Sequence, residues 1–406
     1  MCRAVSLFFP LLSTLPIPWH TFTLSHITTL PPHIISCSWS FHSRFMKYIT
    51  SPPVHATTLT SARCEFKPFM EYAGSYALFN FRLEDPSQGL DYSNLRLIRA
   101  FEHGLDPTSS EAGFVLVHVD MVKNSGPLVK GTVGSLAACE HKQTTLKGDV
   151  VSPRELLNAN LSTILSSLIQ INGSMEKMWG KSKPGAYTSF RTFIFGITSQ
   201  SMFPNGVVYE GVGDEGEPKS FRGESGANDS MIPLMDNLLQ IPMPDTPLTR
   251  ILEDFRSYRP SNHRQFLAWV RGQSEALGLK EWTLGLAGDA VDSDLIESRQ
   301  LWIKMLNQVR DFRWRHWCFA REYILKQTKH PTATGGSPIV TWLPNQLQAV
   351  MEEMVNLYGD LTKSSGSSLG EEVEDIMEMV TRQRETLRKE VAKFCEERGV
   401  AAAVAA

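Results

Sequence analysis

Apolar residues recur at intervals of three and four along most of the chain after Glu65, which is the spacing of one helix face. The segments with this pattern are 69–81, 89–103, 113–125, 151–180, 184–197, 231–241, 248–258, 262–278, 293–327 and 338–358. Alternation with a period of two is confined to brief runs near Val207–Tyr209. We therefore expect an all-α fold, with one large domain of roughly ten helices over residues 66–362.

The two ends of the chain differ from this helical part. Residues 1–65 are rich in Ser, Thr, Pro and His and show no sustained helical period, so we expect a disordered leader, a targeting piece or the product of a faulty gene model. Residues 363–370 have the composition of a flexible linker. Over residues 371–406 we expect a solvated amphipathic helix and a short tail.

Composition narrows the class of protein. The chain has 406 residues, 42% of them hydrophobic, with a net charge of −3, which gives no electrostatic case for a nucleic acid or an anionic membrane as partner. No apolar run reaches the roughly 18–20 residues that span a bilayer. The six cysteines are scattered without metal-type spacing, which is typical of reduced thiols. We expect a cytoplasmic protein.

One histidine lies on an apolar helix face. Within 301–326, a single stripe carries Leu306, Val309, Arg313, His316, Ala320 and Tyr323. A buried imidazole without a partner costs about 1–3 kcal/mol, so His316 must be satisfied somehow. A core hydrogen bond would suffice, and a haem iron is the alternative that suits a neutral imidazole.

Two more polar residues occupy apolar stripes. Arg191 shares a face with Tyr187 and Phe190, so its guanidinium requires either an internal carboxylate or the carboxylate of a ligand. His118 follows Phe114 by four residues on another stripe. It could bond a backbone carbonyl, or face a haem on the side opposite His316.

Two loops combine glycine with small polar residues: FRGESGANDS at 221–230 and PTATGGSPIV at 331–340. Such composition gives backbone freedom and is common in ordinary turns. The second loop is not a phosphate loop, because it lacks the Gly-Lys-Ser/Thr ending.

A set of ordered motifs carries a family resemblance. The motifs are FVLVH at 114–118, SFR at 189–191, VVYEG at 207–211, FRGESGANDSMIPLMDNLLQI at 221–241, RPSNHRQFL at 259–267, RDFRWRH at 310–316, REYIL at 321–325 and TATGGSP at 332–338. Over residues 72–357 the chain resembles the indoleamine 2,3-dioxygenase family, in particular its fungal branch. Residues 1–65 show no relation to the small N-terminal helical domain of that family, which we expect to be largely missing or replaced, with weak haem occupancy as the consequence.

The resemblance implies a haem b enzyme that inserts both atoms of O2 across the indole C2–C3 bond of L-tryptophan. The product would be N-formylkynurenine, the entry to the kynurenine route and to NAD synthesis. A monomer is expected. His316 corresponds to the iron ligand, and Arg313 and Asp236 to a pair on the same side, near a haem propionate.

The resemblance also assigns the substrate side. Arg191 corresponds to the residue that binds the substrate carboxylate, and Phe114 to an aromatic residue that packs on the indole. Ser225 and Gly226 correspond to a loop near substrate and haem. Thr334, Gly335 and Gly336 correspond to a loop that closes over the substrate, and His118, Arg191 and Thr334 are the expected catalytic positions.

The chain departs from vertebrate members at two pocket positions. His118 stands where those members have serine, and we expect it to orient the substrate rather than to act as an obligatory base. Ala186 replaces a second phenylalanine, which predicts a wider pocket. Two other functions stay open: a haem-binding relative with little tryptophan turnover, acting as an oxygen- or haem-responsive protein, and a helical scaffold without a cofactor.

Overall fold

The structure, a computed structural model, describes residues 67, 79–142, 151–209, 216–223, 226–243, 254–288, 290–328, 339–365 and 368–399. Helices form nearly all of the regular structure in these ranges, so the all-α prediction is confirmed. Among the described helices, none combines the length and the apolar composition needed to cross a lipid bilayer.

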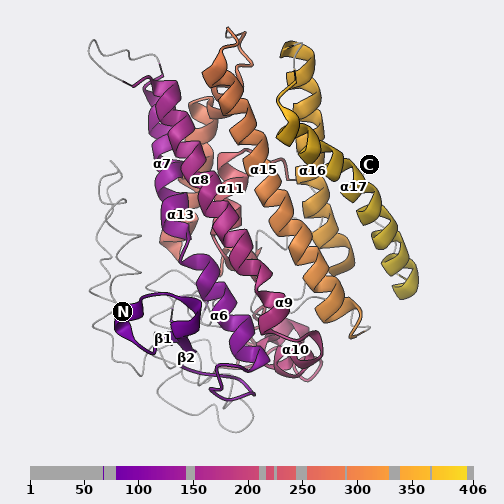
Figure 1. Cartoon of the computed structure of the whole chain (residues 1–406). Helices are drawn as coiled ribbons and strands as arrows, with labels where there is room; N and C mark the ends of the chain where they lie inside the picture. Colours follow the sequence, from indigo (N-terminus) through magenta and orange to yellow (C-terminus); the bar gives the residue numbers. More distant parts are fainter. Residues whose placement is uncertain are drawn as a thin grey trace.

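The long helices form a bundle, with the shorter ones packed at its ends and on one face (Figure 1). The helices are α6 (Ser110–Val122), α7 (Ser125–Glu140), α8 (Pro153–Glu176), α9 (Met178–Lys181), α10 (Pro184–Arg191), α11 (Met231–Leu238), α13 (Ser261–Ala276), α14 (Leu279–Leu284), α15 (Ser293–Phe319), α16 (Ile339–Ser365) and α17 (Glu371–Arg398). Helix α15 packs on α8, α16 and α17, and a π-helical segment, Ala320–Leu325, follows it directly.

The two central helices begin at well-formed caps. Ser152 and Glu155 form a reciprocal capping box at the start of α8, with Pro153 in the first turn. The side chain of Asp292 accepts the backbone N–H of Leu295 at 2.8 Å to begin α15. These caps satisfy N–H groups that have no partner within the helix, and so they fix where each helix begins.

A small sheet replaces one predicted helix. Strands β1 (Phe81–Leu83) and β2 (Leu95–Leu97) pair antiparallel, so the helix expected over 89–103 is wrong. The side chain of Asp91 accepts the backbone N–H of Ser93 at 2.9 Å, which holds a short 3-10 turn instead of an α-helix. Leu95 and Leu97 then alternate into the core with a period of two.

Helices α7 and α14 were not predicted. Helix α7 contains three glycines and a proline, which obscure the apolar period. Two of those glycines allow close packing: a Cβ at Gly131 would lie 2.6 Å from Cγ1 of Ile164, and one at Gly134 would lie 2.1 Å from Oδ1 of Asn160. The small residues that weaken the helical signal therefore bring α7 against α8.

Other boundaries also differ from expectation. The helix predicted over 184–197 ends at Arg191 and gives way to two 3-10 turns. The predicted helices 69–81 and 248–258 fall mainly outside the described residues, and Phe81 itself lies in β1. Near Val207 the period of two corresponds to a single antiparallel bridge with Lys219.

The C-terminal helix packs against the bundle. Helix α16 continues to Ser365, within the segment 363–370 expected to be a linker, and Leu369 near the end of that segment is buried. Helix α17 contributes an apolar stripe to the main core, with Val373, Val380 and Leu387 each no more than 3% exposed. This helix is therefore part of the same helical body (Figure 1).

Candidate functional site

His316 lies in the last turns of α15, close enough to His118 for the two imidazoles to interact electrostatically. Desolvation and, to a lesser extent, the nearby His118 together lower the pKa of His316 to about 4. The ring is therefore neutral at neutral pH, with one nitrogen lone pair available. Within the described part of the chain, the His316 side chain makes no hydrogen bond, yet the residue keeps some accessible surface. The alternative prediction, that His316 is a core histidine with a hydrogen-bond partner inside the protein, therefore gains no support from the described residues.

His118 approaches from α6. Its Nδ1 lies 2.7 Å from the carbonyl oxygen of Phe114, and burial lowers the pKa of the imidazole. Because a carbonyl only accepts, Nδ1 carries the proton in the neutral ring and Nε2 is left as an acceptor. His118 can thus accept a hydrogen bond from an N–H donor.

An aromatic cluster surrounds Phe114. Its ring centroid lies 4.8 Å from that of His118, 5.2 Å from that of Tyr187 and 5.6 Å from that of Phe190. Tyr187 in turn lies 5.8 Å from Tyr323 of the π-helical segment. These rings form an apolar wall of the kind that suits a flat aromatic ligand.

Arg191 ends α10 and is almost entirely buried, with 4% of its surface exposed. Desolvation lowers its pKa, a hydrogen bond with the Tyr187 side chain opposes that shift, and the guanidinium carbon lies 4.6 Å from the centre of the Phe195 ring. Tyr187 therefore links the buried cation to the Phe114 wall. Tyr187 shares the helix face of Arg191 in the sequence pattern, but its link to Arg191 is visible only in the folded contact.

Two contacts hold the segment around α9, one from the π-helical segment and one from α6. The Tyr323 hydroxyl donates to the carbonyl oxygen of Ser182 at 2.5 Å and lies 3.2 Å from that of Met178. A Cβ at Gly113 would lie only 1.8 Å from the carbonyl oxygen of Lys181, so this position admits glycine alone. The residue next to Gly113 is Phe114, and its place beside α10 follows from this close approach.

The predicted pairing of Arg313 with Asp236 is present. Nη2 of Arg313 lies 2.7 Å from Oδ1 and 2.8 Å from Oδ2 of Asp236, and Nη1 donates to the carbonyl oxygen of Gln346 at 3.2 Å. Burial raises the pKa of Asp236, and the Arg313 charge opposes that shift. The pair joins α15 to α11 one helical turn before His316.

The loop before α11 is held by a buried arginine. Gly226 begins a 3-10 turn that ends at Asn228, and Arg259 donates to the carbonyl oxygens of Asn228 at 3.3 Å and Asp229 at 3.1 Å. On the other side of this loop, a Cβ at Gly196 would lie 2.0 Å from the backbone nitrogen of Gly223. Ser225, Thr334, Gly335 and Gly336 lie outside the described residues.

The donors near His316 suit a haem iron better than a bare metal ion. Nowhere in the described ranges do three or more His, Cys, Asp or Glu side chains gather as metal ligands. A porphyrin supplies four nitrogen ligands itself and needs one protein imidazole, which His316 offers in its neutral form. Arg313, three residues before His316 on α15, is a cation that could hold a haem propionate.

The structure thus brings part of the predicted site together. His316 and His118 interact electrostatically, and Phe114 reaches Arg191 through Tyr187. The aromatic wall and the buried arginine come from α6 and α10, whereas the imidazole that faces them comes from α15.

Comparison with known proteins identifies the relatives of this chain. Indoleamine 2,3-dioxygenase 1 of Rattus norvegicus is 26% identical over 278 residues, which span 68% of this chain and 62% of the rat protein. Indoleamine 2,3-dioxygenase of Saccharomyces cerevisiae is 28% identical over 49% of this chain and 44% of its own length. The 6-hydroxytryptophan 2,3-dioxygenase of Fusarium equiseti is 28% identical over 39% of this chain and 37% of its own.

A family model, indoleamine 2,3-dioxygenase, matches residues 39–386. The match begins before residue 65, so residues 39–65, for which we expected no relation to the family, are within it. It also includes the segment 363–370 and the first part of α17. Because the match extends over most of the sequence, the chain belongs to the indoleamine 2,3-dioxygenase family.

Proposed function

We propose that this protein is a haem-dependent dioxygenase that cleaves the indole C2–C3 bond of L-tryptophan to give N-formylkynurenine, as in the kynurenine route to NAD. The observation that carries the proposal is the neutral His316 imidazole, which lies opposite His118 and makes no hydrogen bond among the described residues. Family membership supports the same reading.

His316 would hold the iron and Arg313 a propionate of haem b. Bound haem supplies the iron at which dioxygen is activated. The low pKa of His316 keeps the imidazole unprotonated at neutral pH, so protons do not compete for its lone pair.

Arg191 would bind the carboxylate of the amino acid. Its guanidinium is buried against Phe195 and Tyr187, where an ion pair is stronger than it is in water. The planar fork of arginine can donate two parallel hydrogen bonds to a carboxylate, which fixes orientation as well as position.

Phe114 and His118 would hold the indole. The Phe114 ring offers an apolar surface for the bicyclic system, and Nε2 of His118 can accept the indole N–H. Because His118 is held by the Phe114 carbonyl, it orients the substrate without moving. We therefore expect His118→Ala to raise KM with a modest loss in kcat. A complete loss of turnover with haem retained would contradict this role.

A ring-substituted tryptophan is the second candidate substrate. Ala186 immediately precedes Tyr187, and its small side chain would leave more room for a substituted ring than the phenylalanine that the family resemblance leads us to expect there. One fungal relative is named for 6-hydroxytryptophan. Comparison of kcat/KM for L-tryptophan and 6-hydroxytryptophan, in the wild type and in Ala186→Phe, tests this. The substitution should lower the value for the hydroxylated substrate more.

The assay that tests the main proposal adds haem, a reductant, L-tryptophan and air to the purified chain and follows N-formylkynurenine by absorbance. Tryptamine, which lacks the carboxylate, is the matched substrate. We expect Arg191→Ala to lower kcat/KM for tryptophan about a hundredfold and to leave tryptamine almost unchanged. Arg382→Ala, on the exposed face of α17, is the matched control.

Three results would count against the proposal. Equal losses for both substrates would exclude the carboxylate contact at Arg191. Stable haem binding through His316 without turnover of any tryptophan would favour a haem-responsive relative instead. Absence of haem binding would favour a helical scaffold.

A further inference from the structure

Helix α17 and the residue Leu369 before it are joined to α15 and the π-helical segment by a series of polar contacts. From the start to the end of α15, these are the hydrogen bond from Gln300 Nε2 to the Leu369 carbonyl oxygen at 2.8 Å, the Lys304–Glu372 ion pair at 2.6 Å, the Arg310–Gln383 hydrogen bond, and the contacts of Glu390 with Trp317 and Arg321. The most buried donor among them is Trp317, adjacent to His316 in the chain.

Glu390 joins two residues on either side of the point where α15 changes geometry. Its Oε2 accepts the indole N–H of Trp317 at 2.7 Å, and its Oε1 pairs with Nη1 of Arg321. The π-helical segment begins between them, at Ala320. A π turn contains more residues than an α turn, so it rotates every later side chain relative to those before it. One carboxylate therefore sets the register between His316 and Tyr323.

The end of the π-helical segment is also held from α17. Nη2 of Arg398 donates to the carbonyl oxygens of Leu325 at 2.6 Å and Thr328 at 3.3 Å. A cation at carbonyl groups near a helix C-terminus is favourable, because these groups lack partners within the helix.

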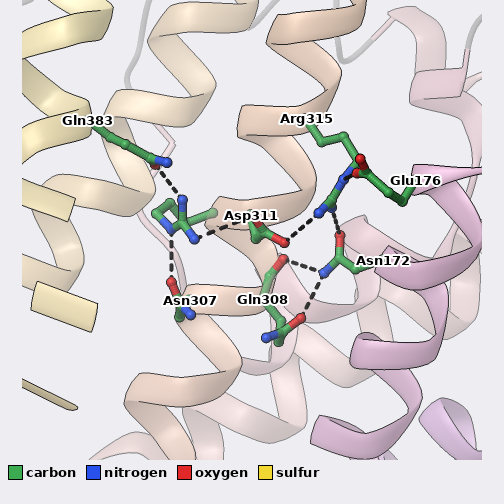
Figure 2. Close-up of polar contacts among 8 residues, drawn as sticks. Asn172, Glu176, Asn307, Gln308, Asp311, Arg315 and Gln383 are labelled. Atoms are coloured by element: carbon green, nitrogen blue, oxygen red, sulfur yellow. Dashed lines mark hydrogen bonds and ion pairs between the residues drawn. The ribbon is translucent and has the colours of Figure 1, made fainter. Parts of the chain in front are cut away.

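Helix α15 is fixed from the opposite side by α8. Arg315 pairs with Glu176, donates to Oδ1 of Asn172 at 2.8 Å and lies 3.0 Å from Asp311. Figure 2 shows these side chains on one side of α15 and Gln383 on the other. With contacts on both sides, rotation of α15 about its axis is opposed, and the direction of the His316 ring is set.

We propose that Glu390 is a positioning residue for the haem ligand, and that it acts through Trp317 and the π-helical segment to set the orientation of His316 and Tyr323. This inference rests on the proposed haem site. The family match ends at residue 386, so Glu390 and Arg398 lie beyond it. The α17 contacts nearest to His316 therefore lie outside the matched region.

The test compares Glu390→Ala with Glu385→Ala. Glu385 lies on the same helix, is exposed and pairs only with Arg388 and Lys389 at the surface, so it is a matched control. The first measurement is amide hydrogen exchange of the haem-free chain. We expect faster exchange at residues 317–325 and 182–191 in Glu390→Ala, because Tyr323 connects the two segments.

The second measurement uses the haem-loaded protein. Resonance Raman spectra of the ferrous form report the bond between iron and the His316 imidazole. We expect its stretching band to shift or broaden in Glu390→Ala, and haem transfer to apomyoglobin to become about tenfold faster. Glu390→Gln keeps an acceptor for Trp317, so its stretching band and its rate of haem transfer should lie closer to the wild-type values than those of Glu390→Ala. Glu385→Ala should match the wild type.

An unchanged band and unchanged haem transfer in Glu390→Ala would overturn the inference, even if the melting temperature fell. If the wild type bound no haem, the proposed function would fail. The hydrogen-exchange data would then test the role of Glu390 separately from the proposed function. If exchange at residues 317–325 were the same in the wild type and in Glu390→Ala, the positioning role of Glu390 would be rejected as well.

Discussion

The two halves of α15 differ in what holds them. From Leu301 to Arg310 nearly every residue is buried, with Trp302, Leu306 and Val309 at 0% exposure. From Asp311 to His316 every residue keeps some accessible surface, and the contacts are ion pairs and hydrogen bonds with neighbouring helices. The first half is held mainly by apolar packing, whereas the second is less tightly packed and is held mainly by polar contacts.

The largest contrast is expected from His316→Ala. The substitution removes the proposed iron ligand and leaves the packed half of α15 unchanged. We therefore expect added haem to lose the Soret band of the histidine-coordinated form. The helical circular dichroism should stay close to that of the wild type. A wild-type Soret spectrum in this variant would show that haem is held elsewhere.

Trp302→Ala should have the opposite pattern of effects, with a loss of stability and no change in haem binding by the folded protein. Truncation of a fully buried aromatic side chain costs about 3–5 kcal/mol, through lost transfer free energy and the cavity left behind. We expect a lower urea midpoint for unfolding. In the fraction that stays folded, haem affinity should match that of the wild type. Weak haem binding by the folded fraction would mean that the two halves are not independent.

Lowering the pH should weaken the contribution of buried histidines to stability but not the apolar packing of Leu301–Arg310, because that stretch contains no histidine. On α13, burial lowers the pKa of His263 to about 4, below its ordinary value of 6.5. The unfolded chain therefore takes up a proton that the folded chain refuses. The free energy of unfolding should fall by up to about 3 kcal/mol as the pH drops from 6.5 to 4.

His263→Gln isolates that contribution. Burial raises the pKa of nearby Asp229 to about 6, and its protonation in acid favours the folded state, so the two groups act in opposite directions. The difference between wild type and His263→Gln in urea titrations at several pH values measures the histidine alone. A difference that does not change between pH 6.5 and 4 would exclude a depressed pKa.

The smallest effect is expected from Asp236→Asn on α11, which changes the partner of Arg313 in the second half of α15. The substitution keeps the shape of the side chain but removes the charge that faces Arg313, at a cost of about 2 kcal/mol. Because Arg313 lies in the same half of α15 as His316, we expect haem affinity to fall along with stability. If Asp236→Asn lowered stability but kept the haem affinity of the wild type, the Arg313–Asp236 pair would stabilise the fold without contributing to haem binding.

Sequence patterns predict the helical class and the stripe of α15, since a period of three and four residues requires no knowledge of tertiary contacts. His316, Arg191 and His118 were identified because a polar residue on an apolar face violates the pattern, whereas Arg313 was assigned through the family resemblance. The β1–β2 hairpin and α7 were missed, because an Asp turn and close-packed glycines override the local period.

The links between site residues depend on distant parts of the chain. The Tyr187–Arg191 contact requires the helix to end at Arg191, and the Tyr323 hydroxyl meets Ser182 across 141 positions of sequence. No local period encodes a π turn, so its effect on side-chain direction could not be predicted either.

The close backbone approaches at Gly113 and Gly196 bear on how this protein could be engineered. Any larger residue at either position would collide with a main chain rather than with a yielding side chain. A mutant library intended to broaden substrate scope should therefore leave both codons untouched and place its diversity at other positions of the candidate site.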